Sequence, residues 1–246
     1  MDNNRMIFKP NLKKIELCLT YRCNVKCNNC SNLCTQAPTD SRMDLTLKDI
    51  EAFINQSVTA NHKWELITLH GGEPILNNSI VQICAILKRY RDIYNHTVRL
   101  SLLSNGSTPS ILSRVRKLCD EYGFDAGISE KVRSNRRGDG TPIPYVPVNV
   151  SPEDDCIPWT QGCFQTTDCG ICLNYAGYWP CSPMAAAARV FGYQPMAKSV
   201  QELSDSVLSK GFDIHCRHCG FAGVMDRVIE QKTSATWQKA IGKYNA

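Results

Sequence analysis

Three cysteines near the N-terminus have the type and spacing that suit iron-sulfur chemistry. In the segment TYRCNVKCNNC, Cys23, Cys27 and Cys30 form a C-x3-C-x2-C arrangement. Three closely spaced thiolates can bind three irons of a 4Fe-4S cubane and leave the fourth iron without a protein ligand. An open coordination position allows substrate chemistry, whereas a metal centre with all positions filled by protein does not. The alternative is a zinc knuckle, which is disfavoured because zinc motifs pair their cysteines in two separated halves.

A second group of cysteines lies in the C-terminal part of the chain, where six residues could bind metal: Cys163, Cys169, Cys172, Cys181, Cys216 and Cys219. One possible ligand set joins Cys169 and Cys172 to the C-x2-C pair that begins at Cys216, which is the spacing of a zinc ribbon. The other set keeps the pair at Cys216 and adds Cys163 and Cys181, which flank a hairpin that contains a glycine. Either set supplies four thiolates and leaves no open coordination position.

The 14 cysteines in 246 residues indicate metal binding rather than disulfide bonds. The N-terminus has no uninterrupted apolar segment typical of an export signal, and no stretch approaches the ~20 apolar residues of a membrane span. We therefore expect a cytoplasmic protein with no membrane partner, in a compartment that keeps thiols reduced. The net charge of +5 is scattered along the chain, which predicts no nucleic-acid partner. Cys18, Cys84 and Cys119 lie in apolar patterns and are expected in the core.

The first 150 residues alternate apolar strand-like runs with amphipathic helices, which predicts parallel βα units. Strands are predicted at 15–20, 65–70, 98–103, 124–129 and 145–150. Helices are predicted to begin near Thr46, Asn78 and Pro109, the first with a capping-box spacing to Asp49. The first cysteine group follows the first strand, at the end where (β/α) barrels place their chemistry. We expect an α/β fold with a partial (β/α) TIM-like barrel in residues 1–150.

The strand and helix rhythm is lost in the second part of the chain, and residues 151–246 are expected to form a small Cys-rich domain. The segment LNYAGYWPC predicts a hairpin that turns at Ala176 and Gly177, and PMAAAARVF and SVQELSDSVLS predict two helices. The polar segment KVRSNRRGDGTPIP, which precedes this part, predicts a loop that can lie over the site. His215 and His218 flank the last cysteine pair and are expected to be polar loop residues rather than ligands.

At the first cysteine group the chain resembles the radical S-adenosylmethionine (SAM) superfamily, in which this cysteine spacing follows the first strand. Two further segments match the family: Gly71, Gly72, Glu73 and Pro74 after the second strand, and Ser104, Asn105 and Gly106 after the third. In the family, the first of these segments binds the amino group of SAM and the second lies near its ribose. Two glycines also let backbone carbonyls approach a ligand closely. The resemblance covers roughly the first 150 residues.

The chain departs from the family pattern at Asn29. Many members have an aromatic residue before the third cysteine, where it borders the adenine of SAM. In this chain a contact to the base would come from Tyr21 or from backbone groups. Cys34, which follows the third cysteine by four positions, has no assigned role.

The second cysteine group resembles the truncated SPASM, or twitch, extension of radical SAM enzymes, in which four such cysteines hold one auxiliary 4Fe-4S cluster. This resemblance favours as ligands Cys163, Cys181, Cys216 and Cys219. In size and layout the chain is similar to 2-deoxy-scyllo-inosamine dehydrogenase. A full SPASM domain needs a further cysteine run that the chain lacks, so a second auxiliary cluster is not expected. Cys156, with the unused Cys169 and Cys172, keeps that alternative open.

The resemblance implies three cofactors, namely SAM, a SAM-binding 4Fe-4S cluster and an auxiliary 4Fe-4S cluster. An electron from a reductase or a flavodoxin-type donor would allow reductive cleavage of SAM to a 5′-deoxyadenosyl radical, which abstracts a hydrogen atom from the substrate. The auxiliary cluster, with all its ligands from protein, is expected to accept an electron from the substrate radical. The expected activity is that of a radical SAM oxidoreductase.

The leading hypothesis for the substrate is a small hydroxylated or amino-sugar-like metabolite. The runner-up is a ribosomally made peptide, modified by a crosslink, a thioether or an epimerisation. A third hypothesis, of a different class, is a non-catalytic iron-sulfur or zinc-binding module. Glu130 is a candidate base, and Arg133, Arg136 and Arg137 could bind a substrate anion, although arginines in such a loop are more often solvated.

Overall fold

The computed structural model describes residues 11–27, 30–129, 131–132, 136–137, 162–219 and 233–246. Its core is a six-stranded sheet with the strand order β4-β3-β2-β1-β7-β8. The strands are β1 (Lys14–Cys18), β2 (Leu66–His70), β3 (Arg99–Ser104), β4 (Asp125–Ile128), β7 (Ile171–Asn174) and β8 (Gly177–Trp179). Neighbouring strands are parallel except for β7 and β8, which are antiparallel. The predicted α/β class with parallel βα units is confirmed.

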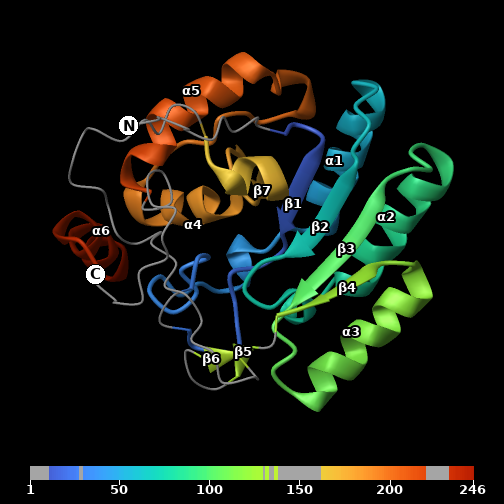
Figure 1. Cartoon of the computed structure of the whole chain (residues 1–246), viewed down its shortest axis with the longest axis horizontal. Helices are drawn as coiled ribbons and strands as arrows, with labels where there is room; N and C mark the ends of the chain where they lie inside the picture. Colours follow the sequence, from blue (N-terminus) through green and yellow to red (C-terminus); the bar gives the residue numbers. More distant parts are fainter. Residues whose placement is uncertain (1–10, 28–29, 130, 133–135, 138–161, 220–232) are drawn as a thin grey trace, which may run out of the picture.

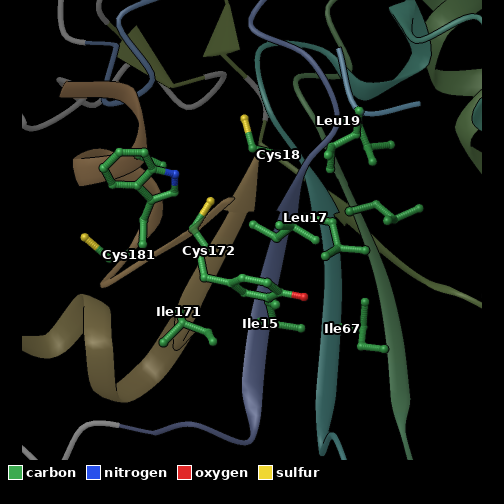
Figure 2. Packing of buried hydrophobic residues seen from close by; sticks show 14 of the residues in the cluster. Ile15, Leu17, Cys18, Leu19, Ile67, Ile171, Cys172 and Cys181 are labelled. Carbon is green, nitrogen blue, oxygen red and sulfur yellow. The ribbon is translucent and has the colours of Figure 1, made fainter. Parts of the chain in front are cut away.

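One face of the sheet is apolar and forms part of the core. Ile15 and Leu17 of β1 pair in register with Ile67 and Leu69 of β2, and all four side chains are fully buried. Figure 2 shows Ile15 and Leu17 beside Ile67, with Ile171 of β7 on the other side of β1. The register is well specified because a slip of β1 by one residue would move Ile15 and Leu17 out of this core and turn the polar Glu16 into it.

The opposite face of the sheet carries polar side chains and a cysteine. Glu16, Thr68 and Ser101 occupy one row across β1, β2 and β3, and Cys172 of β7 continues this row. Glu16 is only 8% exposed, and burial raises its pKa to about 8. Burial disfavours the charged form of a carboxyl group, so the folded protein favours a protonated Glu16 at neutral pH.

We expect the free energy of unfolding of the apo protein to fall between about pH 4.5 and pH 8, with Glu16 as a main cause. The pKa of Glu16 is about 8 when folded and 4.5 for a free side chain, so the unfolded chain binds fewer protons across this window. The stabilisation is fully present below the window and falls by about 3–5 kcal/mol across it, at about 1.4 kcal/mol per pH unit. Urea unfolding of Glu16→Gln should therefore show a shallower pH dependence than the wild type. Identical slopes for the two proteins would contradict this assignment.

Three helices lie side by side along the first four strands (Figure 1). They are α1 (Leu47–Thr59), α2 (Ile80–Ile93) and α3 (Pro109–Tyr122). The predicted capping box is present at α1, where the Thr46 side chain accepts from the Asp49 N–H and the Asp49 carboxylate accepts from the Thr46 N–H. Helix α3 begins after Thr108 and ends at Gly123, whose φ of 70° is a left-handed conformation that favours glycine. These helices begin where the sequence signals predict.

The other long helices lie at the β7 and β8 end of the sheet (Figure 1). They are α4 (Ser182–Phe191), α5 (Asp205–His215) and α6 (Ala235–Asn245). The predicted hairpin is present as β7 and β8, and the predicted helix in PMAAAARVF is α4. The predicted helix in SVQELSDSVLS is wrong in its first half, because the chain forms only a short turn at Val200–Glu202 and α5 starts later. Ser204 has an extended backbone and its hydroxyl accepts from the Val207 N–H, so it caps a new helix.

Several short elements complete the described part of the chain. Short helical turns occur at Ser41–Met43, Pro74–Leu76, Gln165–Cys169, Val200–Glu202 and Cys216–His218. The polar segment after β4, predicted as a loop, contains two short antiparallel strands, β5 (Lys131–Val132) and β6 (Arg136–Arg137). Other predictions lie outside the described residues: the strand at 145–150, the domain boundary after residue 150, Asn29, Glu130, Arg133 and Cys156. No helix in the described part is long and apolar enough to cross a membrane.

Candidate functional site

The loop with the first cysteine group leaves the C-terminal end of β1 and packs against the loop that leaves β2. The Gly72 N–H donates to the Thr20 carbonyl at 2.7 Å, and the Glu73 N–H donates to the Arg22 carbonyl at 2.9 Å. A Cβ atom at Gly71 would lie 2.2 Å from the Thr20 oxygen, and one at Gly72 would lie 2.2 Å from the Arg22 oxygen. The two glycines are therefore needed for contact between the two loops, which is a different reason from the close approach of a ligand.

Glu73 joins the loop after β2 to the loop after β3. Its side chain is fully buried, and its carboxylate accepts from the Ser104 hydroxyl at 3.0 Å and from the Asn105 N–H at 2.9 Å. It also accepts from the Ile75 N–H at 3.3 Å. Burial raises the pKa of Glu73, although the hydrogen bonds from Asn105, Ile75 and Ser104 oppose this shift. The Glu73 side chain therefore serves to position the loops, and its predicted contact with a cofactor stays a prediction.

Removal of the Glu73 carboxylate should destabilise the protein. In Glu73→Ala the buried Ser104 hydroxyl and Asn105 N–H lose their acceptor, and each buried group without a partner costs about 1–3 kcal/mol. Glu73→Gln keeps one acceptor oxygen and should lose less, and the exposed Glu65→Ala should lose little. Urea unfolding of the three apo variants measures these differences. Equal stabilities for Glu73→Ala and Glu65→Ala would show that the link between the loops is not needed.

Asn105 connects the same network to the first cysteine. Its side-chain amide donates to the Cys23 sulfur at 3.6 Å and to the Asn24 side-chain oxygen at 2.9 Å. The Val25 N–H also donates to the Cys23 sulfur, at 3.5 Å. Hydrogen bonds to sulfur stabilise a thiolate and tune an iron-sulfur cluster. The surroundings of Cys23 therefore suit a thiolate ligand.

The structure brings the thiols of Cys23, Cys30 and Cys34 close together. Burial raises the pKa of Cys23, and the nearby Cys30 thiol raises it further. A hydrogen bond with the Cys30 thiol is the largest cause of the raised pKa of Cys34, followed by burial and then by the charges of Cys30 and Cys23. Cys27 lies on the same loop and is half-buried. Cys34 is thus placed beside two of the three predicted cluster ligands.

Two arginines that the sequence reasoning missed hold the cysteine loop in place. Arg22 forms an ion pair with Asp44 at 2.5 Å and donates to the Leu76 carbonyl at 2.6 Å. Arg189 of α4 donates to the Ala37 carbonyl at 2.6 Å and to the Asn32 carbonyl at 2.7 Å. The only local signal was that Arg22 directly precedes Cys23, because the partners of both arginines lie far away in the sequence.

Tyr21 does not line a base pocket as the sequence suggested. Its side chain is 1% exposed, and its hydroxyl accepts from the Asn174 amide at 3.0 Å. The Arg189 guanidinium lies 3.9 Å from the centre of its ring. Tyr21 is therefore part of the packing between the cysteine loop, β7 and α4.

The four cysteines of the predicted auxiliary set lie near enough to influence one another's pKa. Burial raises the pKa of Cys181, and the neighbouring Cys163, Cys219 and Cys216 thiols raise it further. The pKa of Cys216 is raised by burial, then by Cys219 and Cys163. Cys163 precedes β7, Cys181 follows β8, and the last pair follows α5. Four thiols from three segments therefore lie near one another, although no group of three potential ligands in the described residues is arranged closely enough to hold a metal ion as it stands.

The alternative zinc-ribbon set is not brought together in this way. Cys172 lies beside Cys18 and Glu16, whose charges contribute to its raised pKa after burial. The pKa of Cys169 is raised to about 12 by burial and then mainly by Glu16. Zinc requires its sulfurs to converge at about 2.3 Å from one ion, and the charges that act on Cys169 and Cys172 come from Glu16, Asp168, Cys18 and Cys163 rather than from Cys216 and Cys219. The thiol neighbours therefore disfavour a zinc ribbon.

The remaining sulfur and histidine side chains are engaged with the protein. Cys18, Cys84 and Cys119 are buried, as predicted. The two ring nitrogens of His215 lie 2.8 Å from the Gly211 and Gln194 carbonyls. His218 contacts the Tyr193 hydroxyl and stacks on Phe191. The expectation that both histidines are polar loop residues is wrong for His215, which ends α5 and is 1% exposed.

Comparisons with known proteins agree with the resemblance that the motifs indicate. Residues 16–122 match the family model of a 4Fe-4S single cluster domain. The structure is similar to that of BtrN in complex with AdoMet and 2-DOIA, with a TM-score of 0.54 and 16% sequence identity over 92% of this chain and 99% of that chain. A second BtrN structure, in an open conformation, gives a TM-score of 0.49 at 16% identity over 89% of this chain and 92% of that chain. No curated protein matches the chain.

The family match covers the segment with the first cysteine group and with the loops after β2 and β3, and the structural match spans most of both chains. The chain therefore has the α/β fold of BtrN, and its residues 16–122 match a 4Fe-4S single cluster domain.

Proposed function

We propose that this chain is a radical SAM enzyme that oxidises a small substrate. One observation carries the proposal: the three sequence segments that resemble the family form a single hydrogen-bonded unit at the C-terminal ends of β1, β2 and β3. Glu73 binds Ser104 and Asn105, and Asn105 binds the sulfur of Cys23. The match of residues 16–122 to a 4Fe-4S single cluster domain supports the proposal.

The proposed ligands of the SAM-binding cluster are Cys23, Cys27 and Cys30. The proposed SAM contacts are backbone groups of the segment from Gly71 to Pro74 and of Ser104 and Asn105. When bound, the cluster and SAM would supply an oxidising carbon radical that abstracts a hydrogen atom from the substrate. The contribution of the protein is to hold three loops in a fixed relation and to cover the thiols, which Glu73 and Asn105 do through the hydrogen bonds described above.

A second 4Fe-4S cluster is proposed at Cys163, Cys181, Cys216 and Cys219. Four thiolates suit a cluster that transfers electrons, because no coordination position is left for a substrate. This cluster would accept the electron that the substrate loses, and a reductase or flavodoxin-type protein would supply electrons to the first cluster. Proximity of the four thiols supports the assignment.

The substrate class that we propose is a small hydroxylated metabolite. The structure of BtrN, which has the same fold, contains AdoMet and 2-DOIA, and this supports a small-molecule substrate over a peptide. A ribosomally made peptide is the second candidate.

Formation of 5′-deoxyadenosine is the first test of the proposed function. The protein would be reconstituted anaerobically with iron and sulfide, reduced, and incubated with SAM. Release of 5′-deoxyadenosine and methionine is expected even without substrate, at a low rate that the correct substrate raises. A protein that holds iron but leaves SAM intact would favour the non-catalytic module.

A further inference from the structure

The Cys34 thiol, which the proposed function does not use, lies against the thiol of a proposed cluster ligand. It forms a hydrogen bond with the Cys30 thiol. The Cys34 thiol also lies within 3.9 Å of the Asn32 carbonyl oxygen. The two cysteines belong to one short turn, since the Leu33 N–H donates to the Cys30 carbonyl at 3.0 Å.

The backbone between the two cysteines is shaped so that their side chains meet. Leu33 has a φ of 53°, a left-handed conformation that is uncommon and strained for a non-glycine residue. This conformation is held by its surroundings, because the Leu33 side chain is fully buried and the Ala37 N–H donates to its carbonyl at 2.8 Å. Arg189 binds the carbonyls of Asn32 and Ala37 on either side. The contact between the thiols is therefore a fixed feature of the loop.

Both cysteines are also partly exposed to solvent. Cys30 and Cys34 are partly buried with some solvent exposure, whereas Cys84 and Cys119, a second pair of neighbouring thiols, are buried in the core. Exchange with a dissolved disulfide requires access as well as a neighbouring thiol. Of these two pairs, only Cys30 and Cys34 combine a neighbouring thiol with exposure to solvent.

We propose that Cys30 and Cys34 form a reversible disulfide in the cluster-free protein, and that this bond withholds Cys30 from cluster assembly until it is reduced. The oxidant is a small disulfide such as oxidised glutathione. One protein thiol attacks it and releases one reduced glutathione, and the second protein thiol then displaces the other, so two protein thiols become one disulfide. Because the sulfurs are already in contact, closure to an S–S length of about 2.05 Å needs only a small movement. Only the consequence for cluster assembly depends on the proposed function.

The experiment uses the full-length apo protein under native conditions. The wild type, Cys34→Ser and Cys119→Ser are treated with oxidised glutathione, free thiols are alkylated, and disulfides are mapped by mass spectrometry. A Cys30–Cys34 crosslink is expected in the wild type and in Cys119→Ser. It should be absent in Cys34→Ser, and dithiothreitol should remove it.

Cluster assembly supplies a second readout. After oxidation and removal of glutathione, the reconstituted wild type should contain about four fewer iron atoms per chain than wild type that was not oxidised. Four irons are the content of one 4Fe-4S cluster. Dithiothreitol given before reconstitution should restore this iron, and oxidised Cys34→Ser should retain more of it than the oxidised wild type. Thiols of Cys30 and Cys34 that both remain alkylatable, or crosslinks of Cys30 to another cysteine only, would overturn the proposal. A failure of SAM cleavage would leave the crosslink unaffected, so the two proposals fail separately.

Discussion

Cys23→Ala and Cys30→Ala should abolish SAM cleavage by the reconstituted protein, while Cys216→Ala should keep part of it. The first two variants lose a ligand of the proposed SAM-binding cluster, and two thiolates do not hold a cubane that normally has three. The effect should exceed the about 100-fold loss that follows removal of a partner in the outer shell of a metal site. Cys216 belongs to the proposed auxiliary set, which lies on other segments of the chain. Release of 5′-deoxyadenosine, iron content and electron paramagnetic resonance spectra measure the difference.

Cys119→Ala provides the matched control for these variants. Cys119 is buried in α3 and its neighbouring thiol is Cys84, so the variant loses packing but no proposed ligand. It should keep both clusters and the rate of SAM cleavage. If Cys30→Ala and Cys216→Ala lost SAM cleavage to the same degree, the division of roles between the two cysteine sets would be wrong.

Gly72→Ala should destabilise the loop contact at the site and prevent assembly of the first cluster. The new Cβ atom would lie 2.2 Å from the Arg22 carbonyl oxygen and 3.1 Å from the Cys23 Cβ. The Arg22 carbonyl is backbone and the Cys23 Cβ is bonded directly to backbone, so neither can move as the end of a flexible side chain would, and the cysteine loop and the loop after β2 must separate. Overpacking of this kind costs about 1–3 kcal/mol or more. Urea unfolding of the apo protein and iron uptake during reconstitution measure the two effects.

Gly242→Ala is the control for the steric argument. Gly242 lies in α6, and a Cβ atom there would meet nothing within 4 Å. Alanine is favoured over glycine in a helix by about 1 kcal/mol, so this variant should be as stable as the wild type or more stable. Its iron content should be unchanged. A Gly72→Ala protein with normal stability and normal iron uptake would show that the two loops can part without consequence.

The effects expected for the cysteine variants and for Gly72→Ala both depend on the hydrogen-bond network around Cys23. Glu73 is expected from the sequence to bind SAM, and in the structure its carboxylate accepts hydrogen bonds from Ser104, Asn105 and Ile75. An acidic residue that is fully buried among protein donors fixes loop geometry. This role of Glu73 in the loop geometry is separate from its predicted contact with SAM, which stays a prediction.

Local patterns were sufficient for much of the fold. Period-2 and period-3.6 patterns predicted β1 to β4 and α1 to α3, because these elements bury one face and their caps are local. The same reasoning failed in SVQELSDSVLS. The helical spacing of apolar residues continues through Ser204, but the backbone of Ser204 is extended and interrupts the helix. A serine within such a run can either continue the helix or cap a new one, and the spacing of apolar residues does not distinguish these two outcomes.

The sequence alone determined the chemistry that the chain can support. The spacing of Cys23, Cys27 and Cys30, with the segments GGEP and SNG at strand ends, indicated a cluster site at one edge of a parallel sheet, because these signals depend on residue type and local spacing.

The tertiary structure decided which distant groups meet. It placed β7 beside β1, gathered Cys163, Cys181 and Cys216 at one place while Cys172 went to Glu16, and set Cys34 against Cys30. Such pairings depend on how separate segments pack in three dimensions, and residue type and spacing along the chain carry no record of that packing.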